Sequence, residues 1–167
     1  MVSPQHESVV LAKCRNCVCV WDTSTGKIRN KIAESMLGSV VSLAKLTKDG
    51  QYLLLVESGN LCIWNLTSLS MIYKEDFDKE IVDIVMQEKE KRCFIVSKNE
   101  ENQKHFLHVS LRVLPTGKTV YDFQFPVLRI KPICITFEGA YLVTVAWEKK
   151  VVILLLLFFK LTLCLLL

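Results

Sequence analysis

Proline is scarce in this sequence, with only 4 in 167 residues, while 51% of the residues are hydrophobic and 23% are charged. Disordered chains show the reverse balance, because they lack the apolar surface that would offset the entropy lost on folding. The composition therefore excludes a disordered protein. It allows one folded core of ordinary size.

Clustered basic charge is also missing. The formal net charge is only +4, and Lys and Arg stand singly or beside Glu along the chain. Proteins that bind nucleic acid usually gather these residues into a stripe that follows the phosphates. We therefore expect no nucleic-acid partner.

Neither a disulfide framework nor a secretory signal is expected. The 7 cysteines are an odd number, and Cys62, Cys93 and Cys134 stand within runs of Val, Ile, Leu and Phe, where a thiol behaves as a small buried hydrophobe. The chain does not open with a basic start, an apolar stretch and a cleavage site. These features favour a reducing, cytoplasmic location.

The sequence does contain a repeat. The segment CVCVWDTSTGK has a partner in LCIWNLTSLS, which places Trp21 and Trp64 at the same position, 43 residues apart. Arg112 and Leu154 occupy the tryptophan position in two weaker copies. A period of about 40 to 45 residues is typical of propeller blades.

Short apolar runs bounded by turn signals lie between these positions and predict β-strands. Asp49-Gly50 and Gly139 each stand between two apolar runs, as in a β-hairpin. Gly26 and Gly117 occupy the same turn of two repeats, between the expected third and fourth strands. Four strands per repeat predict an all-β chain, a partial β-propeller of about three to four antiparallel blades.

Three motifs resemble those of the WD-repeat family: VWDTSTGK, with Trp21 and Asp22; IWNL, with Trp64 and Asn65; and LTKDGQYLLL, around Asp49. The chain is also similar to the propellers of the NACHT and WD repeat domain-containing proteins. The Gly-His pair that usually opens a WD repeat is absent, so these copies are degenerate. The resemblance implies a non-enzymatic scaffold that binds other proteins without a cofactor.

The repeat divides the chain into blades. The resemblance covers residues 1–155, and an apolar tail follows at residues 156–167. We expect an incomplete first blade, two whole blades and an incomplete last blade, at residues 1–33, 37–77, 79–126 and 130–155. Since propellers usually need more blades to close, we predict a fragment or truncated isoform of a larger protein. Its open edges and apolar faces predict self-association.

The last seventeen residues, VVILLLLFFKLTLCLLL, carry a single charge, Lys160. As a helix they would span about 25 Å at about 1.5 Å per residue, less than the roughly 30 Å hydrocarbon core of a membrane. A strand at residues 151–155 fits the repeat period better. A tail-anchored membrane protein stays open as an alternative.

A second alternative is a P-loop nucleotide hydrolase. The run Thr116-Gly117-Lys118-Thr119 matches the end of that motif, but Arg112 replaces the glycine required five residues before Gly117. Gly26 and Lys27 take the same place in the first repeat. This correspondence favours a hairpin turn over a phosphate-binding loop.

Residues with catalytic or metal-binding potential are few. Cys14 and Cys17 have the spacing of half a zinc site, with Cys19 nearby, but no second pair completes four ligands. His105 and His108 would point to opposite sides of a strand. A Ser-His-Asp or Cys-His arrangement stays open, because such partners are distant in sequence, but nothing in the sequence singles one out. We expect no metal site, no cofactor and no enzyme activity.

The remaining expectations concern packing and contacts. Trp21 and Trp64 should pack between blades, because tryptophan is highly buried on average. The loops at residues 88–92 and 99–104 carry charges of both signs and should be solvated hairpins. Such loops are where a propeller would contact a protein partner.

Overall fold

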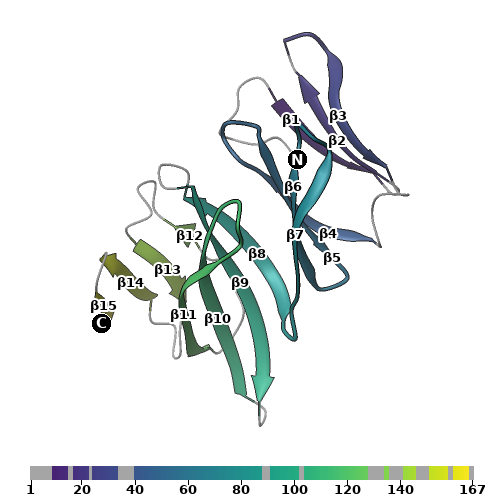
Figure 1. Ribbon diagram of the computed structural model, residues 1–167. Helices are drawn as coiled ribbons and strands as arrows, with labels where there is room; N and C mark the ends of the chain where they lie inside the picture. The colour runs from purple at the N-terminus through teal and green to yellow at the C-terminus, as the bar shows by residue number, and fades with distance from the viewer. Residues whose placement is uncertain are drawn as a thin grey trace. The chain divides into compact units, whose positions relative to one another are not determined.

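Most of the chain forms β-strands in the computed structural model (Figure 1). The structure describes residues 9–14, 17–22, 24–33, 40–87, 91–101, 104–127, 134–135, 141–145, 151–157 and 160–165. Every regular element in these ranges is a strand, which confirms the all-β prediction for them. The same ranges hold no helix with the length and apolar character to span a membrane.

The N-terminal strands build two sheets. The first sheet consists of β1 (Val9–Cys14), β2 (Cys17–Asp22) and β3 (Lys27–Ala33), in that order. The second sheet consists of β4 (Val41–Leu46), β5 (Tyr52–Glu57), β6 (Asn60–Asn65) and β7 (Ser70–Asp76). Adjacent strands pair antiparallel in both sheets.

Two further sheets follow, again in chain order. The third sheet consists of β8 (Glu80–Gln87), β9 (Arg92–Glu101), β10 (Lys104–Val113) and β11 (Thr119–Val127). The fourth sheet consists of β12 (Cys134–Ile135), β13 (Tyr141–Val145), β14 (Val151–Leu157) and β15 (Lys160–Leu165). Strand β15 lies in the expected apolar tail, where it pairs antiparallel with β14.

The chain divides into two compact units. The first comprises Met1–Asp78 together with Val113–Lys118, and the second comprises Lys79–Arg112 together with Thr119–Leu167. The turn between β10 and β11 therefore belongs to the first unit.

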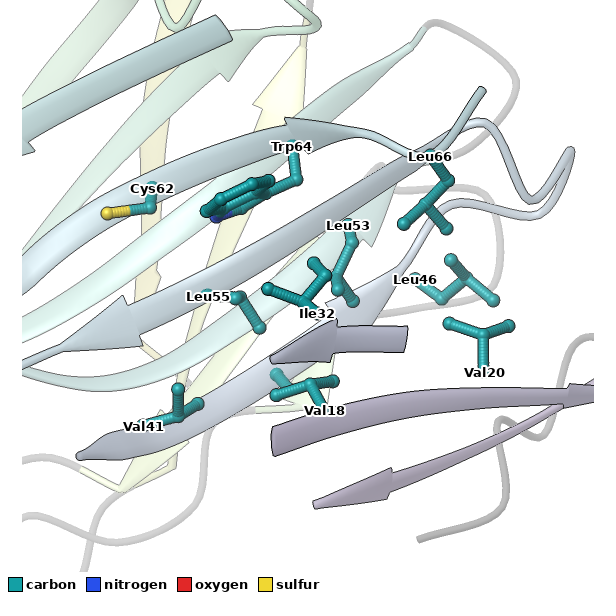
Figure 2. Close-up of a cluster of buried hydrophobic side chains, with 11 residues drawn as sticks. Val18, Val20, Ile32, Val41, Leu46, Leu53, Leu55, Cys62, Trp64 and Leu66 are labelled. Atoms are coloured by element: carbon teal, nitrogen blue, oxygen red, sulfur yellow. The ribbon is translucent and has the colours of Figure 1, made fainter. Parts of the chain in front are cut away.

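The first and second sheets share a hydrophobic cluster (Figure 2). Side chains alternate between the two faces of a strand, so Cys62 and Trp64 of β6 lie on one face of the second sheet. They join Val18, Val20 and Ile32 of the first sheet in this cluster. Its other members are Val41, Ala44, Leu46, Leu53, Leu55 and Leu66. Since burying each such side chain contributes roughly 1.5–3 kcal/mol, this cluster holds the two sheets together.

The third sheet has its own buried centre. Four consecutive residues of β9 are buried, Cys93, Phe94, Ile95 and Val96. Successive residues point to opposite faces, so burial of all four means that both faces of this inner strand are covered. Strand β11, at the edge of the sheet, is instead largely exposed over residues 119–124.

Hydrogen-bonded turns join the strands of the second sheet. In the turn after β4, Gly50 has a φ of 67°, and Asp49 Oδ1 accepts hydrogen bonds from the Gln51 amide at 3.0 Å and from Thr47 Oγ1 at 2.6 Å. The two-residue turn after β5 has positive φ at both Ser58 (44°) and Gly59 (88°). This combination is the type I′ geometry, which matches the twist of the strands it joins.

A β-bulge recurs at one position in three sheets. The strand register shifts immediately before Trp21 in the first sheet, before Trp64 in the second and before Arg112 in the third. The extra residue lies on the edge strand each time: Arg29, Ile72 and Val120. A bulge increases local twist and interrupts the ladder, which makes an edge strand a poor template for another strand.

Candidate functional site

Three turns lead from the strands with the tryptophan position, β2, β6 and β10, to the edge strands β3, β7 and β11. We call them the outer turns: residues 22–27, 65–70 and 113–118. Each has one residue with a positive φ among those that the structure describes: Gly26 at 66°, Leu69 at 51° and Gly117 at 70°. Glycine adopts this conformation without a Cβ clash, whereas leucine is strained in it.

Side-chain oxygens close the first two outer turns. Asp22 Oδ1 accepts hydrogen bonds from the amides of Ser24 at 2.9 Å and Thr25 at 3.1 Å, and from Ser24 Oγ at 2.5 Å. Asn65 Oδ1 accepts the amides of Thr67 at 2.8 Å and Ser68 at 3.2 Å. The Ser24 hydroxyl, followed by the Thr25 amide, lowers the pKa of Asp22. Asp22 and Asn65 therefore have the same structural role, which is to accept backbone amides of the turn that follows them.

The third outer turn packs on an aromatic ring. A Cβ atom added to Gly117 would lie 2.5 Å from Cε1 of Tyr73, a residue of β7. The Tyr73 hydroxyl donates a hydrogen bond to Glu75 Oε2 at 2.6 Å, which holds the ring in place. Glycine at residue 117 is thus required by a close approach as well as by its φ.

The same geometry bears on the nucleotide-binding alternative. The Gly117 amide donates to the Val113 carbonyl at 2.9 Å, and the Lys118 amide donates to Thr116 Oγ1 at 3.4 Å. A P-loop needs such amides directed at phosphate oxygens. Here they close their own turn.

The residue at the tryptophan position, and its exposure to solvent, differ from sheet to sheet. Trp64 is 4% exposed and lies in the cluster between the first two sheets, but Trp21 is 37% exposed. In the third sheet Arg112 is buried, and its Nε donates to Ser110 Oγ at 3.0 Å. Trp21 is therefore more exposed than the predicted burial between blades.

Two buried thiols lie in the strands. Burial raises the pKa of Cys62 to about 11, with a further contribution from the Glu57 carboxylate. Burial raises the pKa of Cys93 to about 12, and the positive charge of Arg112 opposes this shift. Both thiols are protonated at neutral pH, so neither is an activated nucleophile.

A Ser-His-Asp set joins three strands of the third sheet. Ser97 Oγ of β9 lies 3.3 Å from His108 Nδ1 of β10, and His108 Nε2 lies 2.5 Å from Asp122 Oδ1 of β11. Sequence reasoning missed this set because the three residues are distant in sequence. A catalytic serine must be open to substrate, but Ser97 is fully buried. The set fits a polar tie between strands better than an active site.

The cysteines and histidines considered as metal ligands do not form a metal site among the residues that the structure describes. The thiols of Cys17 and Cys19 lie 3.7 Å apart, and the backbone of Cys14 pairs with Cys17. The residues that the structure describes include no group of three or more His, Cys, Asp or Glu side chains suited to a metal. His105 is exposed and lies 3.8 Å from Glu100.

Some predictions fall outside the described ranges. Gly139 is one of them, and residues 88–90 and 102–103, within the two predicted contact loops, are others.

The chain is similar to known propeller proteins in both sequence and structure. The sequence matches the family described as the NWD2 C-terminal beta-propeller over residues 2–162. The chain belongs to this family. Among solved structures, the NWD2-family chain is similar to the crystal structure of RRP9 WD40 repeats, with a TM-score of 0.66 and 14% identity. No curated protein matches it.

The match to the WD40 structure covers 97% of this chain and 49% of the other. The NWD2-family chain therefore spans about half the length of that structure. At this identity the similarity shows the fold, and it identifies the four sheets as propeller blades of the WD type.

The edge strands of three blades each carry exposed apolar side chains. Ile28 of β3 is 46% exposed, as is Met71 of β7, and Tyr121 of β11 is 45% exposed. Ile72 and Val120, the bulged residues of β7 and β11, are also exposed. We call these five residues the edge positions; each lies on an edge strand just after an outer turn.

Proposed function

We propose that this NWD2-family chain is a non-catalytic scaffold in the cytoplasm that binds other proteins through the edge positions of its blades. The observation that carries the proposal is repetition. Exposed apolar residues follow the outer turn on the edge strands of three sheets, although nothing in the fold of an edge strand requires them there. Ile28 and Met71 share one register position, and Ile72 and Val120 share the next. Exposed apolar groups that recur in this way mark interaction sites.

The edge positions favour contact through side chains. The bulges at Ile72 and Val120 interrupt the free ladder of β7 and β11, which disfavours the addition of a partner's strand. The bulged side chains of Ile72 and Val120 are exposed.

The polar chemistry of the chain supports a non-catalytic role. The Ser97 hydroxyl is buried, and the thiols of Cys62 and Cys93 have raised pKa values. Thiols without a disulfide at Cys17, Cys62 and Cys93 suit a reducing compartment.

Site-specific photocrosslinking tests the proposal. A photoreactive phenylalanine analogue placed at residue 72 or 121 in cells should crosslink a discrete protein partner. The same analogue at residue 74, an exposed polar position of β7, is the matched control and should not. Replacing both Met71 and Ile72 by serine should remove the partner, while serine at Lys74 and Asp76 should not. Equal crosslinking from all positions would contradict the proposal.

A further inference from the structure

Positive charge gathers on the edge strand of the first sheet. Lys27, Arg29 and Lys31 of β3 are exposed, and so is Ile28, which lies among them. In the sequence these cations stand singly, but the strand places all three along one free edge, which we call the basic edge. Within the part of the chain that the structure describes, none of the three forms an ion pair with a carboxylate.

The exposure of the basic edge follows from its place on an edge strand. Strands β3 and β7 share one pattern of exposure over residues 27–31 and 70–74, in which only the fourth residue is half-buried. The two segments are aligned by their bulges, at Arg29 and Ile72. Strand β7 keeps this exposure although the second sheet packs against the first through the shared cluster.

The charge of this edge is not shared by the other two. The bulged residue is Arg29 in β3, but it is Ile72 in β7 and Val120 in β11. Residues 27–31 include three cations and no carboxylate. The aligned segment of β7 has one cation, and that of β11 has one cation and one carboxylate. Three blades thus present different chemistry from the same backbone positions.

The carboxylates near the basic edge are bound within their own turns. Asp22 pairs in register with Lys27, but its Oδ1 accepts hydrogen bonds from the outer turn that follows it. A Cβ atom added to Gly50 would lie 3.5 Å from Arg29 Nη1, which places the guanidinium beside the turn after β4. In that turn Asp49 Oδ1 likewise accepts hydrogen bonds from its neighbours in the chain.

We propose that the basic edge binds an acidic segment of a partner protein, with Ile28 packing on an apolar side chain of that segment. Glu and Asp complement Lys and Arg, and complementary charge across an interface selects the partner and speeds association. The bulge at Arg29 interrupts the free ladder of β3, so side chains hold the segment. This inference rests on the proposed function, because Ile28 is an edge position.

The number of cations favours a protein over other anionic partners. A protein that binds nucleic acid commonly contacts about six to ten phosphates, and a segment that binds an anionic membrane gathers about four to eight Lys or Arg. The basic edge has three cations, and an exposed apolar residue lies among them. An acidic peptide with one apolar side chain matches this arrangement.

Fluorescence anisotropy with the full chain tests the proposal. The probe is a short fluorescein-labelled peptide of Glu and Asp around one central leucine, and the control peptide has Lys in place of Glu and Asp. Only the acidic peptide should bind, with a Kd below about 1 mM. Lys31→Glu should raise this Kd at least about threefold, and adding Arg29→Glu should raise it at least about tenfold. Lys74→Glu, at the register position of Lys31 on β7, is the matched control and should leave the Kd unchanged.

A charge swap separates recognition from misfolding. The double variant Arg29→Glu, Lys31→Glu should gain binding to the basic peptide, and circular dichroism checks that it keeps its β-structure. The proposed function is tested by crosslinking at residues 72 and 121, on other strands, so the two proposals can fail separately. The inference is overturned if the acidic peptide does not bind at about 1 mM, or if Lys74→Glu weakens binding as much as Lys31→Glu. Tighter binding of single-stranded RNA or phosphatidylserine vesicles than of the acidic peptide also overturns it.

Discussion

The first and second sheets carry the same repeat in different surroundings. Both have a tryptophan directly after a bulge, and in both an oxygen of the next side chain, Asp22 or Asn65, caps the outer turn. The indole of Trp64 is buried, and that of Trp21 is not. The local structure of a blade is therefore set within the blade, while burial of its tryptophan depends on a neighbouring sheet.

The largest effect should come from truncating the two tryptophans. Trp64→Ala should lower the free energy of unfolding by about 3–5 kcal/mol, because it leaves a cavity in the shared cluster. Trp21→Ala should lower it by less, under about 2 kcal/mol, because more than a third of this side chain is already exposed. Urea denaturation of both variants measures the difference. Equal losses would show that the two tryptophans have the same surroundings.

The glycines of the outer turns provide a second test. Gly117→Ala should cost about 2–4 kcal/mol, because backbone strain adds to a collision with Tyr73. Gly26→Ala should cost only about 1 kcal/mol, because it adds strain without a collision. Thermal unfolding of both variants compares them. Adding Tyr73→Ala to Gly117→Ala should remove the part of the stability loss that comes from the collision with the Tyr73 ring. If the losses of the two single variants simply add in the double variant, residues 73 and 117 are not in contact.

Leu69 occupies the glycine place in the second outer turn and offers a gain in stability. Leu69→Gly should raise the free energy of unfolding by about 0.5–1 kcal/mol, because it relieves a φ of 51° that leucine rarely adopts. Leu69→Ala is the control, since it removes the exposed side chain and keeps the strain. If alanine stabilises as much as glycine, the strain is not the cause. Chemical denaturation of Leu69→Gly and Leu69→Ala measures the two changes in the free energy of unfolding.

The smallest effect should come from the residue that caps the first outer turn. Asp22→Asn should be nearly neutral at pH 7, since Asn65 makes the same contacts. The pKa of Asp22 is lowered in the folded state, so its charge stabilises the fold above the ordinary pKa of Asp. That contribution is lost as pH falls through the lowered value. The wild type should therefore lose stability relative to Asp22→Asn in acid, as melting temperatures across pH would show. A pH-independent difference would contradict this.

Local signals predicted much of the fold. The Asp49-Gly50 pair and the tryptophan period mark strands and turns because they act through backbone conformation and nearby hydrogen bonds. A signal for Leu69 was present too, since it stands 43 residues after Gly26, the spacing of the two tryptophans. Strand β15 had no such signal, because a run of leucines does not distinguish a strand from a helix.

The Ser97, His108 and Asp122 set was beyond sequence reasoning. Its members lie on three neighbouring strands, and pairing depends on a register that includes a bulge between Leu111 and Arg112. A one-residue change of register would move a side chain to the other face of the sheet. No spacing in the sequence encodes that choice.

By itself the sequence determined most of the strands, two of the three outer turns and the membership of a blade, because backbone preference and short-range hydrogen bonds act over a few residues. Only the tertiary structure decided which tryptophan is buried, which glycine meets an aromatic ring and which polar side chains meet across strands. Those outcomes depend on surfaces from distant segments, and burial is a property of the pair of surfaces in contact.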